Sequence, residues 1–449
     1  MKKLGMALPM AALLGIAASL AGCGGTSTPV EGASSSGGSS SGSGGSSGSS
    51  GGTGTGTAAL VYGCNWLFES DAQTANIFYP DTSAVYWVAA LPDSIPSGDQ
   101  IEIAGTSPTA RYFSFEVYTE NGKAESGAND AAIFGSAATP AQAVAAGQGY
   151  KLSVIYSTTA ASSGTTLVAD PANVSLRAPA HKFILYRLYL PTSGAADFGN
   201  LPVLTYVAQD GTRTPLSATP DQASCNTILN NIDKLLAADG ASSGSGSSSS
   251  SGGLALAEPA IKPPSMSIYR STAGRFQNLD VRYMREKTNA TLGDLLLVRG
   301  KAPAFAGSGQ TPQVRYWSVC SDGAHKPYPA VECLVDQDAH IGADGYYNVV
   351  ISTDTPPAGY QSQFDYLPFG ADAFGQPIYR QLLAAPSFSQ SIDNSSILLG
   401  PKLTMGDYYP DTAYCSSSVF SSNLAAGAAA VFAACKSSQG VGIVPDLGN

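Results

Sequence analysis

Short segments in which apolar and polar residues alternate make up most of the chain beyond residue 60. A period of two runs through 111–118 and again through 314–320, which predicts strands with one buried and one exposed face. The pair Asp344-Gly345 lies between two such segments and predicts a hairpin turn, because Asp-Gly accepts the positive φ angles that these turns require. Many short strands separated by turn signals predict a mainly β protein, built from sandwiches of the jelly-roll type.

The strand-like segments form an internal repeat. The phrase Arg111-Tyr112-Phe113-Ser114 returns as Arg315-Tyr316-Trp317-Ser318. The matching segments stand in the same order in both halves: 98–105 with 293–300, 111–114 with 315–318, 149–158 with 345–353, and 189–202 with 366–377. A fixed order of matches indicates a duplicated domain with insertions in its loops. The recurrence of Arg111 and Arg315 indicates that both serve the fold rather than a ligand site.

Helical patterns are confined to the end of each half. Apolar residues recur at helical spacing in 224–238, and the Ala-rich segment 417–435 also predicts a helix, although a glycine within it weakens the pattern. Between the halves, a Gly/Ser-rich run followed by prolines marks a linker at 240–264. We therefore expect two related β-sandwich domains, 58–239 and 265–449, each ending in a short α-helix.

The first residues carry an export signal. Lys2 and Lys3 precede an apolar stretch at 4–19, a pattern typical of a secretory signal rather than of a membrane-spanning helix. The stretch ends in Leu20-Ala21-Gly22-Cys23, which resembles a bacterial lipobox. Residues 1–22 are then a lipoprotein signal peptide, and Cys23 is expected to carry fatty acyl chains such as palmitate. The alternative is an ordinary signal peptide followed by a chance cysteine.

The segment after Cys23 predicts a tether. Residues 23–57 are almost entirely Gly, Ser and Thr. A chain of this composition is flexible and spans roughly 30 Å. Gly24, rather than Asp, follows the cysteine, as in lipoproteins that are sent to the outer membrane. We expect a protein of the bacterial cell envelope that is held to a membrane through its N-terminal lipid, at the outer membrane where the host has one.

The charge balance excludes one class of partner. Charged residues are only 12% of the chain and the net charge is -10. Nucleic acid is therefore not an expected partner, because binding phosphates requires a basic face. Lys and Arg do not cluster either, so no polybasic membrane patch is expected.

The cysteines predict disulfides. Acylation of Cys23 leaves six of the seven cysteines, and an exported protein normally oxidises such a set. Local spacing narrows the possible pairings to a hairpin pair, a pair that fixes the last helix, and the pair that remains: Cys320 with Cys333, Cys415 with Cys435, and Cys64 with Cys225. Zinc is the alternative, but no Cys-x-x-Cys occurs. We expect no metal and no cofactor.

Catalytic candidates are few. A Ser-His-Asp hydrolase would need one of the three histidines, and a glycosidase would need two converging acids. The residues concerned are His181, His325 and His340, and the pairs Glu116 with Glu120 and Glu332 with Asp336. Asp336, Asp338 and Asp344 with His340 begin like a calcium loop, but Ile341 stands where that loop requires Gly. The sequence does not indicate that these groups converge, so solvated or structural roles are the expected ones.

Aromatic residues suggest a binding role. Flat rings on the face of a sandwich can stack on sugars, and Trp66, Trp87 and Trp317 are the candidates for contact with a ligand. Aromatic residues that alternate along strands are also what sandwich cores are made of, so a core position is the more common alternative for each.

Several longer runs resemble a family of uncharacterised secreted bacterial proteins. In the second half these are Arg315-Tyr316-Trp317-Ser318 with Cys320, Tyr328-Pro329, Cys333, Asp344-Gly345-Tyr346-Tyr347, and Met405-Gly406-Asp407-Tyr408-Tyr409-Pro410 with Tyr414-Cys415. In the first half they are Gly63-Cys64-Asn65-Trp66 and Tyr79-Pro80-Asp81-Thr82-Ser83-Ala84. The resemblance implies export and paired cysteines, and it implies no activity.

We therefore expect an envelope lipoprotein that acts as a binding or structural module for a glycan or another envelope component. The alternative is an extracytoplasmic hydrolase whose site lies between the two domains, where pockets often form.

Overall fold

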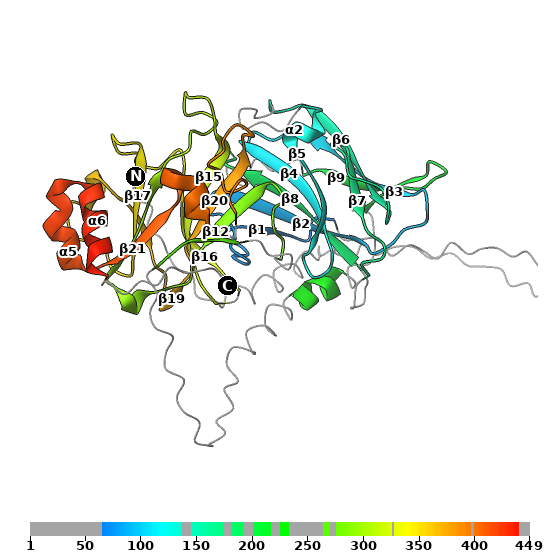
Figure 1. Cartoon of the computed structure of the whole chain (residues 1–449). Coiled ribbons are helices and arrows are strands. Elements are labelled where there is room, and N and C mark those ends of the chain that lie inside the picture. Colours follow the sequence, from blue (N-terminus) through cyan, green and yellow to red (C-terminus); the bar gives the residue numbers. More distant parts are fainter. Residues whose placement is uncertain are drawn as a thin grey trace, which may run out of the picture. The chain divides into compact units, whose positions relative to one another are not determined.

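The computed structural model describes residues 65–136, 145–174, 181–191, 201–216, 225–232, 264–269, 275–325, 327–396 and 399–439 (Figure 1). All of them belong to one compact unit of the chain, 61–449. The predicted signal peptide, the tether, Cys23 and Cys64 lie outside the described residues. Within the described residues, no helix combines the length and the apolar character needed to cross a bilayer.

The first half of the chain forms two sheets. Sheet A is antiparallel, with the strand order β1 (Phe68–Ser70), β2 (Ala84–Pro92), β8 (His181–Tyr189), β4 (Tyr112–Tyr118) and β5 (Ala124–Asn129). Sheet B has the order β10 (Arg213–Pro215), β9 (Val203–Val207), β3 (Gln100–Thr106), β6 (Gly149–Tyr156) and β7 (Thr166–Ala169), and its last two strands are parallel. A short helix, α2 (Asp130–Ile133), follows β5, and residues 225–232 are helical.

The second half forms a matching pair of sheets. Sheet C has the order β11 (Ser267–Tyr269), β12 (Val281–Arg285), β20 (Ile378–Ala384), β15 (Val314–Asp322) and β16 (Ala330–Val335). Sheet D has the order β18 (Asp365–Pro368), β17 (Tyr346–Ser352), β14 (Leu295–Lys301) and β21 (Asp411–Cys415), and β17 and β18 are parallel. The shorter elements are β13 (Thr288–Asn289) paired with β19 (Phe374–Gly375), η3 (Ala290–Leu292), η4 (Tyr360–Ser362), α4 (Pro401–Met405) and η5 (Gly406–Tyr408).

The prediction of a mainly β fold with two related sandwiches is confirmed. Sheets A and C have the same strand order, and B and D share theirs apart from β10. The registers also agree, since Ser114 pairs with Arg187 in sheet A and Ser318 pairs with Arg380 in sheet C. Positions that correspond in this way are called equivalent below.

One of the four predicted matches is wrong. The first three coincide with β3 and β14, β4 and β15, and β6 and β17, which occupy equivalent places in the sheets. Segment 189–202, however, begins at the end of β8, whereas 366–377 begins in β18, whose equivalent is β7. The equivalent of β8 is β20. A shared Tyr-Leu-Pro phrase suggested the pairing, but hydrogen-bond register decides which strands correspond.

Equivalent aromatic pairs join the two sheets of each sandwich. In the first half the rings of Phe113 on β4 and Tyr150 on β6 lie 5.6 Å apart, and in the second half those of Trp317 and Tyr347 lie 5.0 Å apart. Both tyrosine hydroxyls lie over a glycine of the neighbouring strand. A Cβ at Gly105 would come 2.7 Å from the Tyr150 hydroxyl, and one at Gly300 would come 2.6 Å from that of Tyr347.

The prediction of half-exposed central strands is wrong. Every residue of β4, β8 and β15 is buried. The face of sheet A that points away from sheet B packs against the corresponding face of sheet C, through a cluster that includes Tyr112, Tyr189, Tyr316 and Leu382. The rings of Tyr189 and Tyr316 are 5.3 Å apart. Each central strand is thus covered on one face by its own sandwich and on the other by the second half.

The predicted helix 417–435 is divided. It consists of α5 (Ser417–Asn423), η6 (Leu424–Ala426) and α6 (Ala428–Ser438), and the break falls at Gly427, whose φ is 102°. These helices pack Phe420 and Val431 against Leu297 of sheet D. Of the predicted helix 224–238, residues 225–232 are described and helical.

Two of the three predicted disulfides are confirmed. Cys320 and Cys333 join β15 to β16, and Cys415 and Cys435 join β21 to α6. Cys225 is disulfide-bonded. Its pairing with Cys64 stays a prediction, because Cys64 lies outside the described residues.

Candidate functional site

The two halves are joined by a pair of reciprocal salt bridges. Arg111 of the first half contacts Asp336 of the second at 2.5 Å, and Arg315 of the second contacts Asp130 of the first at 2.8 Å. The two arginines are equivalent, and so are the two aspartates, by the register of β4 with β5 and of β15 with β16. The junction therefore has the symmetry of a two-fold dimer interface built within one chain. The prediction that both arginines serve the fold agrees with this position.

A second reciprocal contact lies deeper in the junction. Arg187 donates to the carbonyl of Phe276 at 2.7 Å, and its equivalent Arg380 donates to the carbonyl of Tyr79 at 2.9 Å. Phe276 and Tyr79 are themselves equivalent and have φ values of 54° and 59°. This left-handed conformation is unusual for an aromatic residue. The loop on each side is held in it by the arginine of the opposite half.

A pocket of about 380 Å³ lies on this junction. Its walls come from β1, β2 and β8 of sheet A, from β11, β12 and β20 of sheet C, and from the loops that precede β2 and β12. The lining includes Phe68, Ser70, Ile77, Phe78, Tyr79, Pro80, Tyr86, Val88, Phe183, Leu185, Arg187, Tyr189, Ile232, Tyr269, Arg275, Phe276, Gln277, Asn278, Tyr283, Arg285, Tyr328, Gln376, Ile378 and Arg380. A pocket of this size, mainly aromatic and apolar with a few polar groups, has the character of a small-molecule site.

The charged groups of the described lining are all arginines: Arg187, Arg275, Arg285 and Arg380. Two of them are compensated from behind the pocket wall. Glu116 contacts Arg187 at 2.9 Å, and burial raises the pKa of this carboxyl while the arginine opposes the rise. Asp81 lies 3.9 Å from Arg380 and also accepts hydrogen bonds from Tyr316 and Ser318, so that it ties the two halves together.

Arg285 differs from this pair. Its guanidinium stacks 3.7 Å above the ring of Tyr269, and no carboxylate among the residues that the structure describes lies within ion-pairing distance of it. Two amide groups of the lining also lack an acceptor in the described part of the chain: Nδ2 of Asn278 and Nε2 of Gln376 are buried without a hydrogen bond. The pocket therefore holds donors that are unmatched by protein acceptors.

Asp322 lies beside the pocket residue Gln376. Its backbone carbonyl accepts from the amide of Gln376 at 2.7 Å, and both of its carboxylate oxygens are buried without a hydrogen bond among the described residues. Burial raises its pKa to about 8. At neutral pH the side chain is therefore mainly uncharged.

The three tryptophans proposed for ligand contact are not among the pocket residues. Trp317 is fully buried in the core of the second sandwich, where its indole donates to the carbonyl of Pro303 at 3.1 Å. Trp66 donates to the carbonyl of Pro202 at 2.8 Å and lies 6.1 Å from the ring of Tyr186. Trp87 is partly buried on β2. For Trp317 the core position, which was the more common alternative, is the one observed.

The catalytic candidates are dispersed. His181 is buried on β8, His325 pairs with Asp372 at the surface, and His340 is exposed. Glu116 is bound to Arg187, Asp336 to Arg111, and Glu332 is exposed. The described lining of the pocket contains neither a histidine nor a carboxylate. It therefore offers no general acid or base of these types to a substrate.

The acidic loop near His340 is also used by the fold. Asp336 is part of the junction, and Asp344 pairs with Arg299 at 2.6 Å. Gly345, with a φ of 82°, makes the predicted tight turn. Asp81 comes within 4.8 Å of the sulfurs of Cys320 and Cys333, but those sulfurs form a disulfide and are not thiolate ligands.

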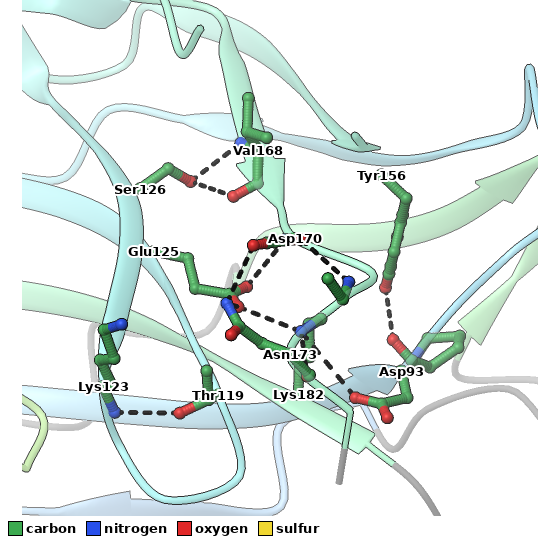
Figure 2. A network of polar contacts seen from close by, with 12 residues as sticks. Asp93, Thr119, Lys123, Glu125, Ser126, Tyr156, Val168, Asp170, Asn173 and Lys182 are labelled. Carbon is green, nitrogen blue, oxygen red and sulfur yellow. Dashed lines mark hydrogen bonds and ion pairs between the residues drawn. The ribbon is translucent and has the colours of Figure 1, made fainter. Parts of the chain in front are cut away.

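A second polar cluster involves Lys182 (Figure 2). Its side chain is fully buried and lies 3.1 Å from Glu125 and 3.9 Å from Asp93, and it donates to the carbonyl of Asn173 at 2.9 Å. Glu125 also accepts from the side chain of Asn173. All of these partners belong to the chain itself, so the cluster joins the end of β2, β5 and β8 to the loop after β7, and none of its members is among the described lining residues of the pocket.

The pocket was not predicted from the sequence. One signal for it was present, since Leu185-Tyr186-Arg187 on β8 returns as Ile378-Tyr379-Arg380 on β20. This repeat identifies both the correct fourth match and four residues of the pocket wall, Leu185, Arg187, Ile378 and Arg380. The segment Tyr79-Pro80-Asp81, which contributed to the family resemblance, lies at the same junction.

No protein-family model and no curated protein sequence matches the chain, so the family resemblance stays a prediction. Among solved structures, an uncharacterized protein from Burkholderia cenocepacia is similar over 72% of this chain and 80% of its own, with 13% identity and a TM-score of 0.45. A Vibrio parahaemolyticus protein is similar over 75% and 90%, with 10% identity and a TM-score of 0.35. Both similarities are too weak to support a conclusion about function.

Proposed function

We propose that the protein is a binding module whose ligand occupies the pocket between its two halves. The observation that supports this is the pocket itself, which has a volume of about 380 Å³ and lies at the junction of two duplicated sandwiches. Small-molecule sites commonly have this size and often lie between domains. Strands at equivalent places in the two halves supply its walls, so the duplication that formed the junction also formed the pocket.

The proposed cellular location is the bacterial cell envelope. The lipobox ending at Cys23 and the Gly/Ser-rich segment 23–57 support a lipid anchor with a flexible tether. In cells supplied with labelled palmitate, the wild-type chain should take up label and sediment with membranes. A Cys23→Ala variant should do neither. Equal labelling of both chains would contradict the anchor.

Binding, rather than hydrolysis, is the proposed activity. The pocket lies where the hydrolase alternative would place its site, yet its described lining has four arginines and no acid or histidine. Arginines without a proton acceptor suit recognition of a ligand better than proton transfer.

The test is a fragment screen by thermal shift and ligand-observed NMR. Leu185 and Ile378 are equivalent buried residues of the pocket wall, so Leu185→Trp and Ile378→Trp should each fill the pocket. Val203→Trp adds the same ring at a position that is 52% exposed and serves as the control.

Fragments should bind the wild type and the Val203→Trp control and be lost from both filled variants. A screen in which no fragment depends on the pocket would overturn the proposed function.

A further inference from the structure

The two ends of the pocket differ in polarity at equivalent positions. On β2 and β12, Val88 of the first half corresponds to Arg285 of the second. Two residues before the equivalent pair Leu185 and Ile378, the first half has Phe183 and the second has Gln376. In the preceding loops, Phe276 corresponds to Tyr79. The polar members Arg285, Gln376 and Tyr79 lie at one end of the pocket, and their apolar equivalents Val88, Phe183 and Phe276 lie at the other.

The end near the first half is apolar. Phe276 reaches across the junction, and its ring lies 5.8 Å from that of Phe183 and 5.4 Å from that of Tyr118. Val88, Phe183 and Leu185 form one buried cluster, against which Ile232 and Phe276 pack. The side chains of this cluster present carbon atoms to a ligand, while Arg275 and Asn278 of the loop that carries Phe276 also line the pocket.

The end near the second half is polar. Tyr79 reaches across in the opposite direction, and its ring stacks on that of Tyr328 at 4.8 Å. Gln376 is only 2% exposed, and its amide nitrogen makes no hydrogen bond within the described residues. Arg285 lies over Tyr269, and no described carboxylate neutralises it. This end therefore offers one uncompensated cation and a buried amide donor.

The nearby acid does not compete for that cation. Asp322 is buried behind Gln376, and the raised pKa of its carboxyl keeps it mainly uncharged at neutral pH. Of the other three arginines of the lining, Arg187 and Arg380 already face Glu116 and Asp81, and Arg275 makes a contact of its own. A ligand would thus meet an excess of positive charge at Arg285, although the whole chain has a net charge of -10.

We propose that the ligand is a small amphipathic organic anion, with its anionic oxygens at Arg285 and Gln376 and its apolar body against Phe183, Val88 and Phe276. This inference rests on the proposed function, since it assigns the chemical class of the ligand to the same pocket. Guanidinium groups bind carboxylate and other oxyanions through paired, charge-assisted hydrogen bonds. An apolar body of the length of a short phenylalkyl chain would then fill the opposite end.

The test uses three compounds that share one body and differ in the charge of the head: phenylbutyrate, phenylbutanol and phenylbutylammonium. Titration calorimetry at neutral pH gives the dissociation constant of each. Phenylbutyrate should bind about tenfold or more tightly than the other two, as expected for a charge-assisted pair.

The preference should depend on Arg285. Arg285→Gln should remove it, and Arg285→Lys should retain part of it because the charge stays. Arg282→Gln is the control, since Arg282 lies on the same strand, pairs with Asp393 and is not a pocket residue.

The outcomes separate this inference from the proposed function. Equal binding of the three compounds, or an anion preference that survives Arg285→Gln, would overturn the anion while leaving the pocket a binding site. Failure of all three compounds to bind, while the fragment screen finds pocket ligands, would also overturn it. Failure in both experiments would overturn the proposed function.

Discussion

Removal of Arg315 should destabilise the protein more than removal of its equivalent, Arg111. The side chains of Arg315 and Asp130 are 0% and 1% exposed, so Arg315→Met leaves a carboxylate buried without its cation. Burial already raises the pKa of Asp130, and Arg315 is the main group that opposes this. Breaking one side of such a pair typically costs about 3–5 kcal/mol.

The mirror pair provides an internal comparison. Each aspartate keeps a backbone donor after its arginine is lost, Asp336 from Trp317 at 3.0 Å and Asp130 from Ala131 at 2.8 Å, but Arg111 is 11% exposed whereas Arg315 is fully buried, so water can reach the Arg111 site more easily. Burial places the pKa of Asp336 at about 6, which allows it to take up a proton when the arginine is lost. The cost of Arg111→Met should therefore be smaller.

The assay is urea denaturation with the disulfides intact, followed by intrinsic fluorescence. Trp317 lies two residues from Arg315 on β15 and reports on the second half. Combining Arg315→Met with Asp130→Asn should recover part of the loss, because no unpaired charge remains. A loss below about 1 kcal/mol for Arg315→Met, as for an exposed pair, would refute the buried junction.

Burial raises the pKa of Asp322 in the folded state to about 8, above its unfolded value, so the stability of the fold should fall as the pH rises between about 4 and 8. Thermal melts at several pH values should show a weaker dependence of stability on pH for Asp322→Asn. An unchanged dependence would contradict the prediction. Reduction of the Cys320–Cys333 disulfide, which spans 13 residues, should lower the free energy of unfolding by about 3 kcal/mol. Hydrogen exchange should then rise in β15 but not in β4. Equal protection of both strands before and after reduction would contradict a stabilising role for this disulfide. Gly300→Ala should lower the free energy of unfolding, measured by urea denaturation, by about 1–3 kcal/mol. The loss should exceed that of Gly105→Ala, because the new Cβ at 300 would also meet a backbone carbonyl oxygen at 3.1 Å. The reverse order would contradict the described packing.

The local structure and the repeat can be predicted from the sequence. Alternation along 111–118 and 314–320 placed β4 and β15, because the side chains of a strand alternate whatever lies around it. Cys320 and Cys333 were paired correctly because a hairpin places neighbouring strands side by side. A glycine in 417–435 was recognised as a weak point, and the helix breaks there.

The residues that cover each face of the central strands depend on how the two halves of the chain pack together. Arg187 and Arg380 are separated by more than the length of either predicted domain, and their convergence depends on how the two sandwiches associate. Periodicity shows that a strand has two faces, but it cannot show that both are buried when the second cover comes from a distant part of the chain. The pocket, its apolar end and its uncompensated Arg285 all arise from that association. The duplicated fold can be predicted because it depends on local patterns. The residues of the site cannot, because they come together only when the two sandwiches associate.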